Sequence, residues 1–247
     1  IAMTDIDVVL WVSRGEPLPT LSYGTRLAER LRAYDLRIRA VPYMKRPLTP
    51  EEINAPYHLL SGGEVPVHSN ERGMVDALRA LGQVLDRTMA LPTDQPGQVI
   101  GTCLGMQMIV AALSTPAMVI EPAQPINVGM EPVFGISDQP LPMAMFHYHR
   151  VDPAFASVAT LNTVYTTADN PITGFRLGRR VTAYQGHPEL SPNDMRLLIA
   201  HNKATIEEYG ATTEAALAQL DQWGDDWHVG LTDQLLIKPF LNPAQEQ

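Results

Sequence analysis

The feature that most constrains the fold of this chain is residues 99–113. There an apolar strand-like run, a short turn and an apolar helical run follow directly on one another. The turn holds Cys103, the only cysteine among the 247 residues, with Gly101 and Gly105 two positions to either side. Glycine is required where a turn is too tight for a neighbouring β-carbon. A strand that switches this abruptly into a helix predicts an α/β fold with Cys103 at the switch.

The helix expected after Cys103 also has a chemical consequence. Its first N–H groups and its dipole stabilise a negative charge at its start, which favours a nucleophilic thiolate at Cys103. A single cysteine is equally well explained as a small buried apolar residue. The turn alone does not decide between these two interpretations.

A cysteine nucleophile needs a base, and the base needs a group that orients it. Residues 185–189, Gln-Gly-His-Pro-Glu, follow an expected strand. In an extended backbone His187 and Glu189 project to the same side, and Pro188 stiffens the pair. Glu189 would then hold the imidazole in one tautomer and leave its other nitrogen facing Cys103. The alternative is an ordinary surface turn.

Three motifs in this order resemble the class I (triad) glutamine amidotransferases, and in particular the amidotransferase domain of GMP synthase. They are Gly-Thr-Cys-Leu-Gly-Met-Gln at 101–107, Gln-Gly-His-Pro-Glu at 185–189 and Leu-Leu-Ser-Gly-Gly at 59–63. The third is similar to the family's oxyanion loop, although the family usually has proline where this chain has Glu64. Three signatures in the expected order, within about residues 8–190, form a specific signal.

Two weaker similarities lie between the cysteine motif and the histidine motif. Residues 129–133 stand where the family has a strand, and residues 146–151 stand where it has a histidine-containing segment that contacts glutamine.

The resemblance implies roles for individual residues. Cys103, His187 and Glu189 would be the catalytic triad, and the backbone N–H groups of Gly63 and Leu104 would stabilise the oxyanion. The substrate-binding residues implied are Gly62, Gly63, Gln107, His147 and Tyr148. The substrate would be L-glutamine, with no cofactor and no metal. An alternative is a zinc site, which would give Glu189 and the two turn glycines no role. Its ligands would be Cys103, His147, His149 and His187.

Strand-like and helix-like runs alternate up to residue 113, which predicts a mainly parallel open sheet with helices on both faces. The resemblance implies that this three-layer α/β sheet is flavodoxin-like. The strands are expected at 8–12, 36–41, 57–60 and 99–102, and the helices at 22–34, from 49, at 70–87 and after Cys103. Ligands of such sheets bind beyond the carboxyl ends of the strands, where both Gly63 and Cys103 would lie.

Residues 118–184 are broken by proline, glycine and asparagine, which favours short strands, antiparallel at the sheet edge. The later strands are expected at 163–167, 172–177 and 180–184.

The resemblance ends near residue 190, so we expect residues 1–190 to form the amidotransferase-like domain. Residues 191–247 would be a C-terminal helical extension packed on the same domain. Helices are expected at 192–209 and 212–223. Trp223 and Trp227 leave open whether the extension only packs on the domain or also serves as a lid or docking surface.

Composition narrows the class of protein. A net charge of −9 argues against nucleic acid as a partner, because phosphate binding needs a basic patch. One cysteine excludes an internal disulfide framework and fits a reducing compartment. No run of about 18 apolar residues appears, and the first residues lack the pattern of a signal peptide. These observations predict a soluble cytoplasmic protein that binds neither nucleic acid nor membrane.

The function expected from the resemblance is glutaminase and amidotransferase activity through a γ-glutamyl thioester. The sequence has no phosphate-binding glycine loop followed by Lys-Ser or Lys-Thr, so ammonia would pass to a partner synthetase or to an acceptor bound directly. An acyltransferase or a γ-glutamyl hydrolase would use the same triad. A non-catalytic regulatory subunit is the third alternative. Whether the chain forms a homo-oligomer is open.

Overall fold

A computed structural model describes residues 6–13, 23–121, 125–224, 226 and 230–241. Its centre is a seven-stranded sheet with the order β2-β1-β3-β4-β11-β10-β9. The first five strands are parallel, as predicted, and their order is that of flavodoxin-like folds. These strands are β2 (Ile38–Pro42), β1 (Val8–Val12), β3 (Tyr57–Leu60), β4 (Gln98–Thr102) and β11 (Val181–Tyr184).

The far edge of the sheet is antiparallel, because β10 (Gly174–Leu177) runs against both β11 and β9 (Thr163–Tyr165). The sequence therefore predicted this edge correctly. All of these strands are short, with β9 only three residues long.

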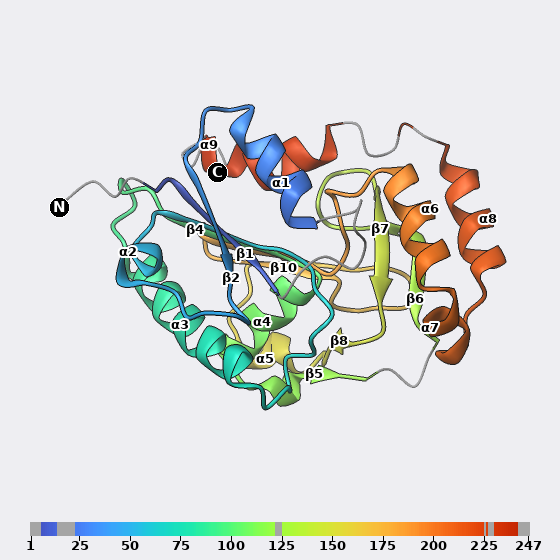
Figure 1. Ribbon diagram of the computed structural model, residues 1–247, viewed down its shortest axis with the longest axis horizontal. Coiled ribbons are helices and arrows are strands. Elements are labelled where there is room, and N and C mark those ends of the chain that lie inside the picture. The colour runs from blue at the N-terminus through green and yellow to red at the C-terminus, as the bar shows by residue number, and fades with distance from the viewer. Residues whose placement is uncertain (1–5, 14–22, 122–124, 225, 227–229, 242–247) are drawn as a thin grey trace.

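Helices cover both faces of the sheet, which makes the three layers seen in Figure 1. Residues alternate along β1, so Val8 and Leu10 pack on one face while Val9 and Trp11 pack on the other. The first face is covered by α1 (Tyr23–Arg32) and by the C-terminal π-helix η2 (Asp233–Ile237) and α9 (Lys238–Leu241). The second face is covered by α2 (Pro50–Ile53), α3 (Arg72–Ala90), α4 (Leu104–Leu113) and α5 (Phe155–Val158).

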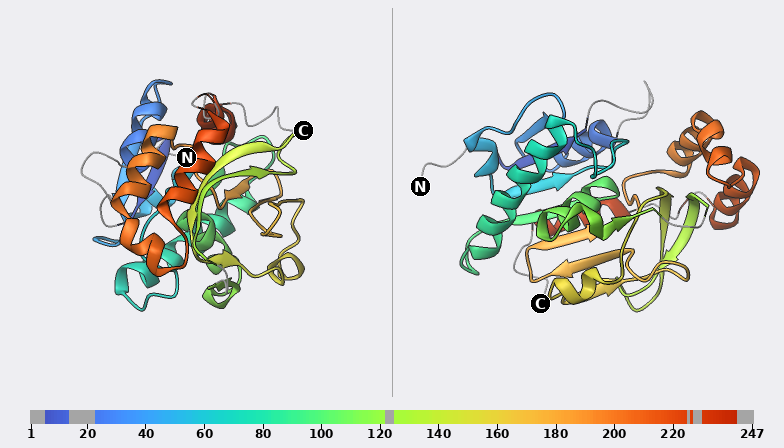
Figure 2. Two further views of the ribbon diagram at one scale, coloured as in Figure 1. Left: turned by 90° about the vertical axis from the view of Figure 1, so that its right-hand side faces the viewer. Right: turned by 90° about the horizontal axis from the view of Figure 1, so that it is seen from below.

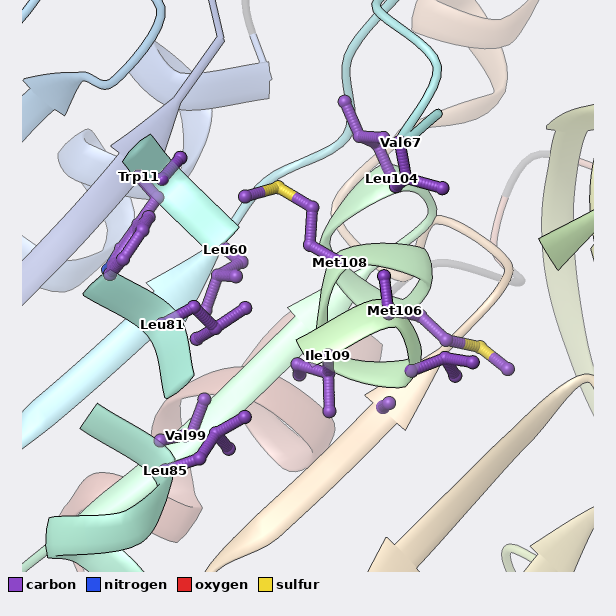
Figure 3. Close-up of a cluster of buried hydrophobic side chains, with 14 of the residues drawn as sticks. Trp11, Leu60, Val67, Leu81, Leu85, Val99, Leu104, Met106, Met108 and Ile109 are labelled. Atoms are coloured by element: carbon purple, nitrogen blue, oxygen red, sulfur yellow. The ribbon is translucent and has the colours of Figure 1, made fainter. Parts of the chain in front are cut away.

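The core on the second face holds α4 firmly against the sheet. Figure 3 shows Met108 and Ile109 of α4 beside Leu60 of β3 and beside Leu81 and Leu85 of α3, all of them buried. Nearly every residue of α4 is buried, so the start of this helix is held in a fixed place at the end of β4.

The helix starts follow the local sequence. Thr49 and Glu52 form the reciprocal capping box at the start of α2, with Pro50 at its first position. The helix expected at 70–87 is α3, and the one expected after Cys103 is α4. Ser22, expected to cap the first helix, lies outside the described residues.

The middle of the chain differs from the expectation in one respect. β6 (Asn127–Val133) and β7 (Leu141–His147) pair with each other in a separate two-stranded sheet, not at the edge of the central one. The hairpin is packed on both sides. One side is buried against the helices of residues 192–223, and Val133, Met143 and Met145 on the other side contact the core on the first face of the sheet. A short 3₁₀-helix, η1 (Pro116–Met118), leads into β5 (Val119–Ile120), which pairs with β8 (Arg150–Val151).

The helices between residues 192 and 223 form a third core with the hairpin, apart from the two faces of the sheet (Figure 2). The single helix predicted at 192–209 is wrong, because it is divided into α6 (Pro192–His201) and α7 (Lys203–Glu208). The Asn202 side chain at the break donates to the carbonyl of Leu198 at 2.8 Å, which competes with continued helix. The helix expected at 212–223 is α8 (Thr213–Trp223). Trp223 is 39% exposed, and Trp227 lies outside the described residues.

The described part of the chain returns after α8 to the first face of the sheet. Leu231, Leu235, Leu236 and Phe240 are buried there beside α1. Among the helices that the structure describes, none has both the length and the apolar character needed to cross a membrane.

Candidate active site

Cys103 lies between β4 and α4 in a backbone conformation that non-glycine residues rarely adopt, with φ 49° and ψ −109°. Its N–H donates to the carbonyl of Tyr184 on β11 at 2.7 Å. A β-carbon on Gly101 would lie 2.6 Å from the carbonyl carbon of Gly105, and one on Gly105 would collide with the carbonyl of Leu60. The glycines therefore allow the sharp turn for the reason expected from the sequence.

His187 and Glu189 face each other, as the i, i+2 spacing predicted. Nδ1 of His187 lies 2.9 Å from Oε1 of Glu189, and each side chain is only 1% exposed. The hydroxyl of Thr102 donates to the same carboxylate oxygen at 3.3 Å. The His187 N–H donates to the carbonyl of Ala144 at 2.8 Å, so the β7 strand fixes the backbone of this loop.

The imidazole of His187 and the side chain of Cys103 both lie against Gly62. A β-carbon at Gly62 would stand 2.7 Å from Cε1 of His187 and 3.5 Å from Cβ of Cys103. Burial lowers the pKa of His187, but the charges and hydrogen bonds of Cys103 and Glu189 outweigh this and raise it to about 10. The arrangement thus favours the imidazolium form of His187 at neutral pH.

The loop after β3 lies against the start of α4. A β-carbon on Gly63 would lie 2.8 Å from Cδ2 of Leu104 and 2.7 Å from Oγ of Ser13. The backbone of Gly63 therefore approaches the first residue of α4, next to Cys103. This closeness brings together the two residues that the resemblance implied as oxyanion donors.

Gln107 points from α4 toward the turn after β7. Its Nε2 lies 3.4 Å from the carbonyl of His149 and 3.4 Å from Oε1 of Gln185. These contacts connect the helix to two loops at the site.

His147 is buried at the end of β7. Its Nδ1–H donates to the carbonyl of His149 at 2.9 Å, which fixes the neutral tautomer with an unprotonated Nε2. Burial lowers the pKa of His147 to about 4, so the ring is neutral at pH 7. The next residue, Tyr148, stacks on Tyr209, which directly follows α7, with ring centroids 4.8 Å apart.

A cavity of about 400 Å³ lies beside Cys103. Of the substrate-binding residues implied by the resemblance, Gly63, Gln107, His147 and Tyr148 line it, and Gly62 does not. The wall opposite comes from α6, α7 and the residues around them, which sequence reasoning did not assign to the site. They are Leu198, Asn202, Thr205 and Tyr209. No motif marked them, because their approach to Cys103 depends on how α6 and α7 pack against the β6–β7 hairpin.

The alternative zinc grouping is not assembled. Within the described residues, no three His, Cys, Asp or Glu side chains are placed together as ligands for a metal ion.

Comparisons with known proteins show the family and the fold. A family model described as glutamine amidotransferase class-I matches residues 20–205. No curated protein sequence matches the chain significantly.

Solved structures share the fold at low sequence identity. A glutamine amidotransferase from Thermotoga maritima has a TM-score of 0.70 at 18% identity, covering 95% of this chain and 97% of that chain. A glutamine amidotransferase from Methylobacillus flagellatus has a TM-score of 0.70 at 14% identity, covering 98% and 97%. A GMP synthase subunit-like protein from Thermoplasma acidophilum has a TM-score of 0.55 at 19% identity, covering 82% and 97%.

Proposed function

Because this chain belongs to the class I glutamine amidotransferase family, we propose that it hydrolyses the side-chain amide of glutamine through a thioester on Cys103. The observation that carries the proposal is the convergence of Cys103, His187 and Glu189 at one rim of the sheet. Cys103 follows β4, and the other two lie in the loop after β11.

The reaction would begin with attack of the Cys103 thiolate on the amide carbon of glutamine. The negative charge that forms on the amide oxygen would be stabilised by the backbone N–H groups of Gly63 and Leu104, which is worth about 3 kcal/mol per donor. The imidazolium of His187 would protonate the nitrogen, the C–N bond would break, and ammonia would leave. A γ-glutamyl thioester would remain on Cys103.

Water would complete the cycle. His187, now neutral, would take a proton from the water as it attacks the thioester carbon, the C–S bond would break, and glutamate would leave. Glu189 would hold the imidazole and stabilise its charged form throughout.

The ammonia would pass to a partner synthetase or to an acceptor bound directly. The structural similarity to a GMP synthase subunit-like protein supports a synthetase partner. We also propose that residues 1–190 form the amidotransferase domain and that residues 191–247 are an extension of it, which supplies the α6–α7 wall of the cavity.

The test is glutamate release from glutamine, measured with and without cell extract. We expect release by the unaltered protein, abolition by Cys103→Ala, and a loss of at least about 100-fold for His187→Ala, the size typical of general acid–base catalysis. His201→Ala, on the exposed end of α6, serves as the matched control. Equal release by Cys103→Ala would overturn the proposal. Release only with extract would identify an activity that depends on a partner.

A further inference from the structure

Thr102 is the last residue of β4 and directly precedes Cys103. It is fully buried, and it pairs in register with Tyr184 on the neighbouring strand β11. Ile100 and Tyr184 both belong to the core on the first face of the sheet. Because side chains alternate along a strand, Thr102 points to this same face, two positions after Ile100. The sequence analysis gave this side chain no role.

The carboxylate of Glu189 is buried and has few hydrogen-bond donors. Its Oε1 accepts from Nδ1 of His187 at 2.9 Å and from the hydroxyl of Thr102 at 3.3 Å. Among the described residues no other group donates to this carboxylate, and its buried Oε2 has no partner there. A buried charged group depends on its hydrogen bonds to offset the loss of water. The Thr102 hydroxyl therefore supplies one of the two contacts that hold Glu189.

The Thr102 hydroxyl is itself held in a fixed place relative to the nucleophile. The backbone N–H of Cys103 donates to the carbonyl of Tyr184 at 2.7 Å, which ties the end of β4 to β11. Threonine is branched at its β-carbon, so few side-chain rotamers are open to it in a strand. One dipeptide, Thr102-Cys103, thus carries both the nucleophile and a donor to the carboxylate that orients the base.

We propose that Thr102 is a positioning residue of the glutaminase reaction. Its hydroxyl holds Glu189, and through Glu189 it orients the imidazole of His187 toward Cys103. Thr102 does not line the cavity beside Cys103, so its effect is indirect. This inference rests on the proposed function, because it concerns the same triad.

Two substitutions at Thr102 separate its hydroxyl from its methyl group. Thr102→Val keeps the branched shape and removes the donor, whereas Thr102→Ser keeps the donor and removes the methyl group. Catalytic groups need supporting hydrogen bonds to stay in the productive geometry. We therefore expect Thr102→Val to lower kcat for glutamine about tenfold with KM within about twofold, and Thr102→Ser to keep kcat within about twofold. The opposite pattern, a loss in Thr102→Ser with kcat retained in Thr102→Val, would show a packing role and overturn the inference.

Thr88 on α3 offers a matched control. It is also fully buried, but its hydroxyl has no partner among the described residues. Thr88→Val should therefore leave kcat within about twofold, and an equal loss of kcat in this variant would overturn the inference. Urea unfolding shows which variants fold. If Thr102→Val folds poorly, comparison of Thr102→Ala with Thr102→Ser isolates the hydroxyl in the same way, and equal kcat values in that pair would also overturn it.

The pH profile of kcat gives a readout that a purely structural role would not change. Among the described residues the titratable side chain in contact with Glu189 is His187, and the charge of Cys103 acts on that imidazole in turn. Without the hydroxyl, the Glu189 carboxylate should take up a proton at higher pH, because a hydrogen bond to its charged form is lost. The acid limb in Thr102→Val should move to higher pH by up to about one unit, while the alkaline limb stays in place. An acid limb that does not move would overturn the inference.

A measurement without turnover separates this inference from the proposed function. Carbon NMR of glutamate-labelled protein follows the Glu189 carboxyl against pH, with Glu189→Gln identifying its signal. We expect the midpoint of this titration to be higher in Thr102→Val than in the unaltered protein, by up to about one pH unit, and unchanged in Thr88→Val. A raised midpoint without glutaminase activity would refute the proposed function and support the hold of Thr102 on Glu189. An unchanged midpoint in an active enzyme would refute the inference alone.

Discussion

At the scale of single residues, the site depends on the absence of side chains as much as on their presence. Cys103 can occupy its unusual backbone conformation because Gly101 and Gly105 allow β4 and α4 to approach each other closely. Gly62 makes room for the imidazole of His187 in the same way. Cys103 and His187 are thus positioned by close approaches that an added methyl group would prevent.

A matched pair of glycine substitutions tests this interpretation. Gly105→Ala should lower the free energy of unfolding by about 1–3 kcal/mol, because the new methyl group would meet the carbonyl of Leu60. Gly82→Ala on α3 should raise it by about 0.5–1 kcal/mol, since nothing lies near the added β-carbon and alanine favours helix. Urea unfolding measures both. A Gly105→Ala protein as stable as the original would contradict the steric argument.

At the scale of elements, the C-terminal segment contacts the loop that holds His187. The hydroxyl of Thr232, just before η2, donates to the carbonyl of Pro188 at 2.8 Å. The next residue, Asp233, pairs with Arg30 on α1 and accepts a hydrogen bond from Tyr34 at 2.8 Å. The segment therefore links α1 to the Pro188–Glu189 peptide, next to His187.

Removal of this hydroxyl should affect catalysis more than stability. Thr232→Val is expected to lower kcat for glutamine about five- to tenfold with little change in KM, the cost of one hydrogen bond of about 1 kcal/mol. Thr232→Ser should restore kcat, because it keeps the donor. Thr212→Val, which removes the N-terminal cap of α8, is the control for general destabilisation of the C-terminal region. An unchanged kcat in Thr232→Val would show that this hydrogen bond does not position His187.

At the scale of the whole molecule, two buried histidines make the free energy of unfolding depend on pH. His58 is fully buried, accepting from Trp11 Nε1 at 3.1 Å, and burial with the nearby charge of Arg87 lowers its pKa to about 3. Burial likewise lowers the pKa of His147 to about 4. Both rings stay neutral in the folded protein while they become protonated near pH 6.5 in the unfolded chain.

Stability should therefore fall as the pH is lowered from 6.5 to 5. In this range the unfolded chain binds more protons than the folded one, so the free energy of unfolding rises with pH, by about 1.4 kcal/mol per pH unit for each histidine at most. His187 opposes this trend only weakly, because its raised pKa keeps it protonated in the folded protein and the unfolded chain is itself mostly protonated below about pH 6. His58→Gln should reduce the slope of the free energy of unfolding against pH by up to about 1.4 kcal/mol per pH unit, the equivalent of one bound proton. The same change at the exposed His201 should leave the slope unaltered. Equal slopes in the two variants would exclude His58 as a source.

The parallel sheet and the positions of Cys103, His187 and Glu189 in the loops after its strands could be predicted from the sequence, because they depend on local patterns. The strand, turn and helix around Cys103 and the i, i+2 spacing of His187 and Glu189 act over a few residues, where sterics and periodicity decide the structure. The parallel orientation of the strands followed from alternating strands and helices.

Other features were decided only by tertiary packing. The packing of the β6–β7 hairpin against α6 to α8 and the α6–α7 wall of the cavity arise from contacts between segments far apart in the chain. Such contacts depend on side-chain volumes and on how the elements dock, and no short motif records them. The sequence by itself determined the strand, turn and helix at Cys103 and the spacing of His187 and Glu189, because these depend on neighbouring residues, whereas the tertiary structure decided the shape and lining of the cavity beside Cys103.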